Sequence, residues 1–245
     1  GKRMKVRMYN VGFGDCFCLR DRKKSLLVDF GTNNSRIEGR PRREIFDVII
    51  SDLSTIKSKN LLLTHFHMDH LSGLLYMMKK KDISVDFGKI YLPDVFSKKE
   101  MSRTLVLLLL ADLLKESGLP SRQVSLFALV DALLENKQNV ELLSRGKLFE
   151  NKYQALWPDT DVIRKETDEV YNRICEDGKF KEVMDVLLEF AEKLRLIVWS
   201  MTAEGNKPAE TVEKETDLTA SELTEQPEVR QKIIRAYVYE REFRR

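Results

Sequence analysis

Four side chains that commonly bind metal ions lie within the six residues 65–70 of this sequence: His65, His67, Asp69 and His70. Imidazole nitrogens and carboxylate oxygens bind zinc at roughly 2.0–2.2 Å, and a catalytic site needs about three protein ligands and an open position for water. The chain of 245 residues contains only 3 histidines, and all of them lie in this cluster. We therefore interpret the cluster as a metal-binding loop.

The segment before the histidines is typical of a buried strand. Residues 60–64 contain three consecutive leucines, and such an apolar run predicts a strand that is covered on both faces. Binding sites in α/β folds lie just beyond the carboxyl ends of strands. We expect Thr64 and Asp29 to hold the loop and to orient the imidazoles. The alternative for Thr64 and Asp29 is an ordinary threonine at a strand end and an ordinary aspartate in a turn. The alternative for the histidine cluster is a solvent-exposed turn in which Asp69 only caps the next helix.

Up to residue 95, the hydrophobic pattern predicts strands that alternate with helices. Apolar residues alternate or form short runs in the predicted strands, and they recur at helical spacing in the predicted helices. The predicted strands are Lys5–Tyr9, Cys16–Leu19, Ser25–Phe30, Asn60–Thr64 and Lys89–Pro93, and the predicted helices are Glu44–Ile56 and Leu71–Lys80. This order indicates an α/β architecture.

From residue 97 the pattern becomes mainly helical. Ser97 and Glu100 form a predicted capping box at the start of a helix. The predicted helices are Ser97–Ser117, Ser121–Asn136, Gln138–Ser144, Asp161–Glu176 and Lys179–Met201, with a strand at Tyr153–Trp157. We accordingly divide the chain into an N-terminal half (1–96), a helical insertion (97–150), a returning core strand (151–159), a helical segment (160–202), a mobile linker (203–228) and a terminal helix or strand (229–245).

Composition limits the classes of partner. Lys plus Arg (42) exceed Asp plus Glu (39) by a formal charge of +3, which is too small to demonstrate a nucleic-acid partner. Basic clusters at 40–43 and 79–81 are either part of such a surface or ordinary solvated residues. The longest apolar run, 105–114, is interrupted by Asp112 and is far shorter than the roughly 20 residues that span a bilayer. The 3 cysteines do not make a disulfide framework, so we expect a cytoplasmic protein in which Cys16 and Cys18 pack in the core.

Three elements of the sequence resemble the metallo-β-lactamase superfamily. They are Val11-Gly12-Phe13-Gly14-Asp15, Val28-Asp29-Phe30-Gly31 and Thr64-His65-Phe66-His67-Met68-Asp69-His70. Their order and spacing are most similar to the branch that contains the hydrolase domain of bacterial competence DNA-uptake proteins. The resemblance covers residues 4–95 closely and the strand near Trp157 more loosely.

The resemblance implies a sandwich of two sheets with helices outside, of which this chain supplies the N-terminal part with large helical insertions. Members of this superfamily commonly bind two zinc ions, or manganese or iron, and hydrolyse phosphate esters, amides or thioesters. By this resemblance His65 and His67 hold the first ion, whereas Asp69 and His70 hold the second. Asp69 also orients the attacking water, and Asp15 supports the ligands. The branch favours a nuclease or phosphodiesterase.

The sequence departs from the superfamily after residue 70. No histidine follows His70, and the only Gly-Asp pair is Gly14-Asp15, although the family pattern includes later ligands. One explanation is that a separate or removed C-terminal half completes a split hydrolase, which we favour because four intact ligands are costly to keep without an ion. Another is a helical interaction subunit with a vestigial metal loop. The third is that carboxylates such as Asp159 and Asp161 substitute for the absent ligands.

Overall fold

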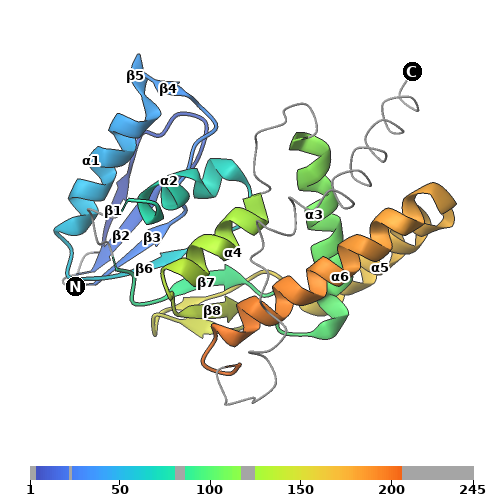
Figure 1. Ribbon diagram of the computed structural model, residues 1–245. Coiled ribbons are helices and arrows are strands. Elements are labelled where there is room, and N and C mark those ends of the chain that lie inside the picture. The colour runs from blue at the N-terminus through green and yellow to red at the C-terminus, as the bar shows by residue number, and fades with distance from the viewer. Residues whose placement is uncertain (1–3, 22–23, 81–85, 117–124, 206–245) are drawn as a thin grey trace. The chain divides into compact units, whose positions relative to one another are not determined.

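The structure is a computed structural model that describes residues 4–21, 24–80, 86–116 and 125–205 (Figure 1). It is a mixed α/β fold with a central mixed sheet, consistent with the metallo-β-lactamase architecture that the resemblance implies. The chain forms two compact units. The first comprises the described residues within 1–93 and 132–141, and the second comprises those within 94–131 and 142–245.

The central sheet contains six strands in the order β1-β2-β3-β6-β7-β8. Strands β1, β2 and β3 pair antiparallel, whereas β3, β6 and β7 pair parallel. Their bounds are β1 Lys5–Met8, β2 Phe17–Asp21, β3 Lys24–Val28, β6 Ser58–Leu62, β7 Ile90–Pro93 and β8 Val140–Leu143. The five strands predicted before residue 95 are confirmed. The helix predicted at Gln138–Ser144 is wrong, because Val140–Leu143 extends beside β7 as a strand.

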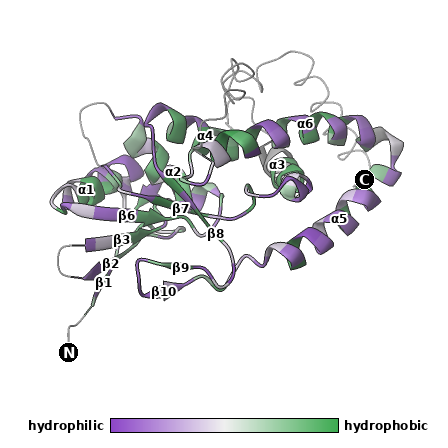
Figure 2. Ribbon diagram, turned by 90° about the horizontal axis from the view of Figure 1, so that it is seen from below, coloured by the Kyte–Doolittle hydropathy of each residue, from purple (hydrophilic) through white to green (hydrophobic). Residues whose placement is uncertain are grey.

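Helices α1 (Arg42–Ser54) and α2 (Met68–Met78) lie on the same side of the strands of the first unit (Figure 2). The side chains of Cys18, Leu27 and Leu61 stand in one cross-strand row and are at most 3% exposed. Arg7 pairs with Cys18 in the β1–β2 register and forms an ion pair with Asp52 of α1. This row therefore faces the helices, and the prediction that Cys16 and Cys18 pack in the core is confirmed by their burial.

The opposite face of the same strands is apolar but incompletely covered. Val6 and Met8 of β1 are 61% and 73% exposed. The next residues in their rows, Leu19 and Phe17 of β2, are only partly buried. Antiparallel strands such as β1 and β2 can expose one face to water, but that face is usually polar. The exposed apolar side chains at the β1 end of this face are therefore unusual.

A short hairpin joins β3 to α1. Strands β4 (Arg36–Ile37) and β5 (Arg40–Pro41) pair antiparallel around a two-residue turn. Both turn residues have positive φ, 50° at Glu38 and 78° at Gly39. This conformation belongs to the turn that matches the twist of a hairpin, and glycine adopts it without strain.

The second unit is mainly helical. Helix α3 (Ser102–Glu116) packs against α5 (Thr160–Glu176) and α6 (Gly178–Ser200). Between α3 and α5, Arg103 donates to Asp168 at 2.9 Å and the hydroxyls of Thr104 and Thr167 lie 2.9 Å apart. The remaining elements are the 3-10 helix η1 (Lys99–Met101), α4 (Ser125–Glu135), whose residues are divided between the two units, and the strands β9 (Leu148–Phe149) and β10 (Tyr153–Gln154).

The capping box predicted at Ser97 is wrong, because α3 begins five residues later at Ser102. The backbone N–H and hydroxyl of Ser97 instead donate to the carboxylate of Asp94 in the turn before η1. The helices predicted at Asp161–Glu176 and Lys179–Met201 are confirmed as α5 and α6. Residues 206–245, which include most of the predicted linker and the whole predicted terminal element, lie outside the described residues. None of the described helices is long and apolar enough to cross a membrane.

Candidate metal centre

The predicted metal loop connects β6 to α2. Leu63 is fully buried after the end of β6, Thr64 is exposed and His65 is partly buried, whereas Phe66 packs in the core. His67 occupies the N-cap position of α2, so Asp69 and His70 lie in its first turn. A negative charge near a helix N-terminus is favourable, and Asp69 supplies one. The loop and the first turn of the helix thus bring potential metal ligands close together.

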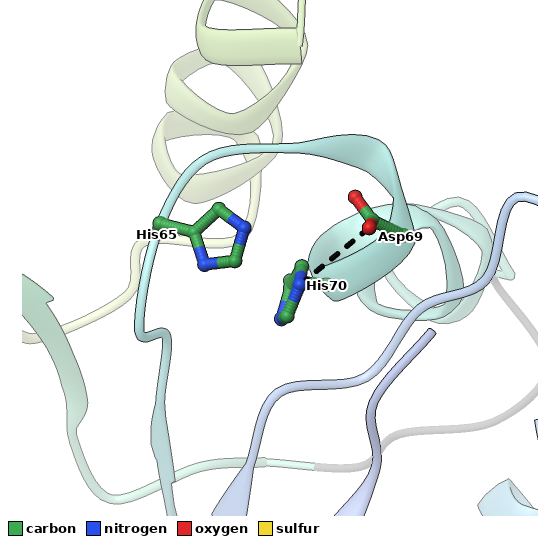
Figure 3. Close-up of side chains that lie close together, drawn as sticks. All are labelled: His65, Asp69 and His70. Atoms are coloured by element: carbon green, nitrogen blue, oxygen red, sulfur yellow. Dashed lines mark ion pairs between the residues drawn. The ribbon is translucent and has the colours of Figure 1, made fainter. Parts of the chain in front are cut away.

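His65, Asp69 and His70 form a compact group (Figure 3). One ligand atom from each lies within 4.8 Å of those of the other two. Nε2 of His70 is 3.6 Å from the Asp69 carboxylate, which is too long for a hydrogen bond. Two ligands at about 2.1 Å from one tetrahedral ion are roughly 3.4 Å apart. This spacing therefore fits two ligands of one ion better than it fits a direct contact.

The protonation state of His65 also fits a metal ligand. The imidazoles of His65 and His70 have ring centroids 3.6 Å apart, and His67 lies 5.0 Å from His65. Burial lowers the pKa of His65, and the neighbouring His70 and His67 lower it further. The neutral imidazole that results is the form that donates an electron pair to a cation.

Asp29 fixes the loop from beneath. It is 2% exposed and has a positive φ of 54° at the end of β3. Its carboxylate accepts from the backbone N–H of Thr64 at 2.8 Å and from the Thr64 hydroxyl at 2.7 Å. It also lies 2.9 Å from Nδ1 of His70. A carboxylate only accepts, so Nδ1 of His70 carries the hydrogen and Nε2 is left as the ligand atom.

Asp15 lies beside the same histidine. Its carboxylate is 3.7 Å from Nδ1 of His70 and its side chain is 43% exposed. Asp15, Asp29 and His70 are a second group whose ligand atoms lie within 4.8 Å of one another. We favour the group of His65, Asp69 and His70 for a cation, because the Asp29 carboxylate already accepts from Thr64 and His70. Asp15 then stands at the rim of the centre.

Two glycines allow the loops beneath the centre to cross. A Cβ atom on Gly14 would lie 2.3 Å from the carbonyl oxygen of Gly31 and 2.7 Å from that of Asp69. A Cβ atom on Gly31 would lie 2.6 Å from the backbone nitrogen of Leu71. Distances under 3.0 Å are not seen for real Cβ atoms. The crossing is closed by hydrogen bonds from the Asp15 N–H to Asp69 and from the Phe30 N–H to His70.

The structure thus brings together six of the seven residues that the sequence singled out. His65, Asp69, His70, Asp29, Thr64 and Asp15 form one connected cluster. His67 is exposed and belongs to neither group, although its ring is close to His65. The pairing of His65 with His67 on a first ion therefore stays a prediction.

Sequence reasoning missed the positioning role of Ser72. Its buried hydroxyl donates to the carbonyl of Thr32 and accepts from the Thr32 N–H, both at 2.9 Å. This reciprocal pair fastens the loop after Asp29 to α2. No pattern in the sequence distinguishes this serine from other helical serines.

The alternative ligand Asp159 has a structural role in the second unit. Its carboxylate accepts from the backbone N–H groups of Asp161 and Val162 at the start of α5. These hydrogen bonds and the Arg145 guanidinium hold the pKa of Asp159 below its usual value. Among the residues that the structure describes, the groups with metal-ligand spacing are the two in the first unit.

Residues 9–94 of the 245 match the model of the Metallo-beta-lactamase superfamily. Neither the curated proteins nor the solved structures contain a match to this chain. The matched segment includes the metal loop, Asp15 and Asp29, and it points to a metal-dependent hydrolase.

Proposed function

We propose that the protein is a metal-dependent hydrolase that cleaves phosphodiester bonds in nucleic acid or nucleotides, with an active site that a C-terminal half or a separate subunit completes. The observation that carries this proposal is the group of His65, Asp69 and His70, whose ligand atoms lie within 4.8 Å of one another above a buried carboxylate. The substrate class rests on the similarity to the competence branch of the superfamily.

The residues of the cluster have separate roles in this proposal. His65 and His70 would hold the ion through imidazole nitrogens, and Asp69 would either bind the ion or accept a proton from the attacking water. Asp29 and Thr64 hold His70 and the loop in place, whereas Asp15 lines the approach. A bound divalent ion lowers the pKa of water and stabilises the charge that develops on the phosphate. We propose zinc and two ions in the assembled enzyme; manganese and iron accept the same donors.

The dependence on a further polypeptide has two supports. First, one short segment of the chain provides all the ligands of the cluster, and their number is smaller than the number that two ions need. Second, the apolar sheet face that carries Val6 and Met8 is largely exposed. A polypeptide that covers this face would shield it and bring additional donors. The free thiols of Cys16, Cys18 and Cys175 fit a reducing compartment, so we place this assembly in the cytoplasm.

The test is elemental analysis and intact mass of the natively purified protein, with hydrolysis of bis(p-nitrophenyl) phosphate measured on the same sample. We expect about two metal ions per assembled unit, a companion polypeptide, and activity that is lost when His65 and His70 are both changed to alanine. A preparation with neither metal nor companion would overturn the proposal and favour a helical interaction subunit. Metal and activity without a companion would overturn only the requirement for a second polypeptide.

A further inference from the structure

Phe13 is an aromatic residue that is exposed on a fixed backbone. Its side chain is 70% exposed. Its N–H donates to the side-chain oxygen of Asn34 at 2.9 Å, and its carbonyl accepts from the N–H of Asn33 at 2.8 Å and from the hydroxyl of Thr32 at 3.1 Å. A role in core packing does not explain this residue, because a ring that packed in the core would be shielded from water. The loop presents the ring to solvent.

The position of Phe13 is coupled to the metal centre. Two residues further along, Asp15 donates its N–H to the carbonyl of Asp69 and places its carboxylate 3.7 Å from Nδ1 of His70. The hydrogen bonds from the Asp15 N–H to the Asp69 carbonyl and from the Gly31 N–H to the Asp15 carbonyl hold this loop in place. Phe13 is therefore two residues away from a carboxylate at the rim of the centre.

The loop that contains Phe13 also contacts the β4–β5 hairpin. Asn10 donates to Glu38 in the β4–β5 turn at 2.8 Å, and Gly12 lies against Asn34 and Ile37. Next to this hairpin, Arg42 and Arg43 begin α1 and are exposed. Within the described ranges their guanidinium groups form no ion pair or hydrogen bond.

The placement of these arginines does not serve the helix. Cations are unfavourable in the first turn of a helix, where the backbone dipole is positive. Pro41 at the N-cap position provides no side-chain hydrogen bond, and Glu44 already pairs with Arg40. Two unpaired guanidinium groups at this position are suited to anionic groups from another molecule, and arginine is well suited to phosphate.

We propose that Phe13 stacks on a base of a single-stranded polynucleotide whose phosphates contact Arg42 and Arg43, with the scissile phosphate at the metal centre. This inference rests on the proposed function and specifies its substrate as a strand with exposed bases. An aromatic ring stacks on any base, because each base has a π face, so the contact is tolerant of sequence. The arginines contribute affinity that depends on salt.

The experiment compares two ligands on the full chain: fluorescein-labelled oligothymidylate and an abasic oligomer of the same length, by fluorescence anisotropy. Loss of one stacked base weakens binding roughly 5- to 150-fold. We expect Phe13→Ala to weaken oligothymidylate binding by this factor and to leave the abasic oligomer unchanged. Phe13→Trp should retain the affinity, which shows that any loss is not due to misfolding. Val48→Ala, which shortens an exposed apolar residue on α1, is the matched control.

The double change of Arg42 and Arg43 to alanine should lower the affinity for both oligomers by the same factor. It should also reduce the slope of log affinity against log salt by about 1.4, which is about 0.7 for each single-strand phosphate contact. Equal oligothymidylate affinity of the Phe13→Ala and wild-type proteins, or no oligothymidylate binding by the wild type, would overturn the inference.

Metal content and hydrolysis of bis(p-nitrophenyl) phosphate on the same samples separate the two proposals. Metal and hydrolysis with no effect of Phe13→Ala on binding would reject the role of Phe13 and keep the hydrolase. A Phe13-dependent preference for the strand with bases, in a protein without metal, would support the role of Phe13 in binding and reject the hydrolase.

Discussion

The buried carboxylate of Asp29 lies 2.9 Å from Nδ1 of His70 and thereby determines which nitrogen of this histidine faces Asp69. The same carboxylate accepts both hydrogen-bond donors of Thr64. The orientation of the centre consequently depends on a residue that lies 41 positions before His70 in the sequence.

Asp29→Asn should weaken metal binding about 10- to 100-fold, which is the usual effect of removing a group that orients a ligand. An amide nitrogen cannot accept from Thr64 or from His70, so one of these contacts is lost. The measurement is the zinc dissociation constant from competition with a chelating dye. Asp94→Asn is the control, because Asp94 is another buried turn aspartate that accepts from a neighbouring hydroxyl. Equal losses in both variants would indicate a general effect on folding.

Single alanine changes should rank the histidines. We expect His65→Ala and His70→Ala to lower zinc affinity at least about 100-fold and His67→Ala to lower it less than about tenfold, since His67 lies outside the groups of close ligand atoms. Isothermal titration with zinc gives the three values. An equal loss for His67→Ala would support the alternative in which His65 and His67 share the first ion.

Gly14→Ala should both destabilise the protein and weaken metal binding, because the new methyl group would lie 2.3 Å from the Gly31 carbonyl oxygen. Forced overpacking typically costs about 1–3 kcal/mol. Urea unfolding and zinc titration measure the two effects. Gly178→Ala is the control, since a Cβ atom there has nothing within 4 Å. The crossing would be shown to be tolerant if the two variants unfolded at the same urea concentration.

Tyr171 should make the protein sensitive to alkali. Burial raises the pKa of its phenol to about 12, and Cys175 contributes to this rise. The unfolded phenol has a pKa of about 10, so between about pH 10 and 12 the unfolded state loses a proton that the folded state keeps. The contribution of the protonated phenol to the free energy of unfolding is therefore complete below about pH 10. It is lost progressively as the pH rises from about 10 to 12. Tyr171→Phe should therefore show a smaller decrease in the free energy of unfolding between pH 9 and 11, measured by urea titration. Parallel decreases in the two proteins would contradict this expectation.

The sequence allowed prediction of most elements of the first unit and of six residues in the centre. The candidate metal ligands are close together in the sequence, and Asp29 follows a clearly patterned strand, so both leave signals that do not depend on tertiary packing. The strand at Val140–Leu143 could not be predicted, because a short apolar run fits a strand or a helix equally well. Its identity depends on pairing within the sheet.

The contacts that arrange the centre could not be predicted for a related reason. Gly14 and Gly31 are visible in the sequence, but only the folded chain shows that their backbones cross against Asp69. The exposure of Phe13 depends likewise on the hydrogen bonds of Asn33 and Asn34. Such relations between distant segments leave no periodic pattern in the sequence.

The contiguity of His65, Asp69 and His70 has a consequence for thermodynamic linkage. Donors so near in sequence remain neighbours after the protein unfolds, so the unfolded chain retains appreciable affinity for the ion. Ligand binding stabilises a protein only to the extent that the folded state binds more tightly than the unfolded state. The rise in melting temperature on adding metal should therefore be smaller than the metal affinity of the folded protein alone would predict. Most of this rise should come from the hydrogen bonds of Asp29, which exist only in the folded chain.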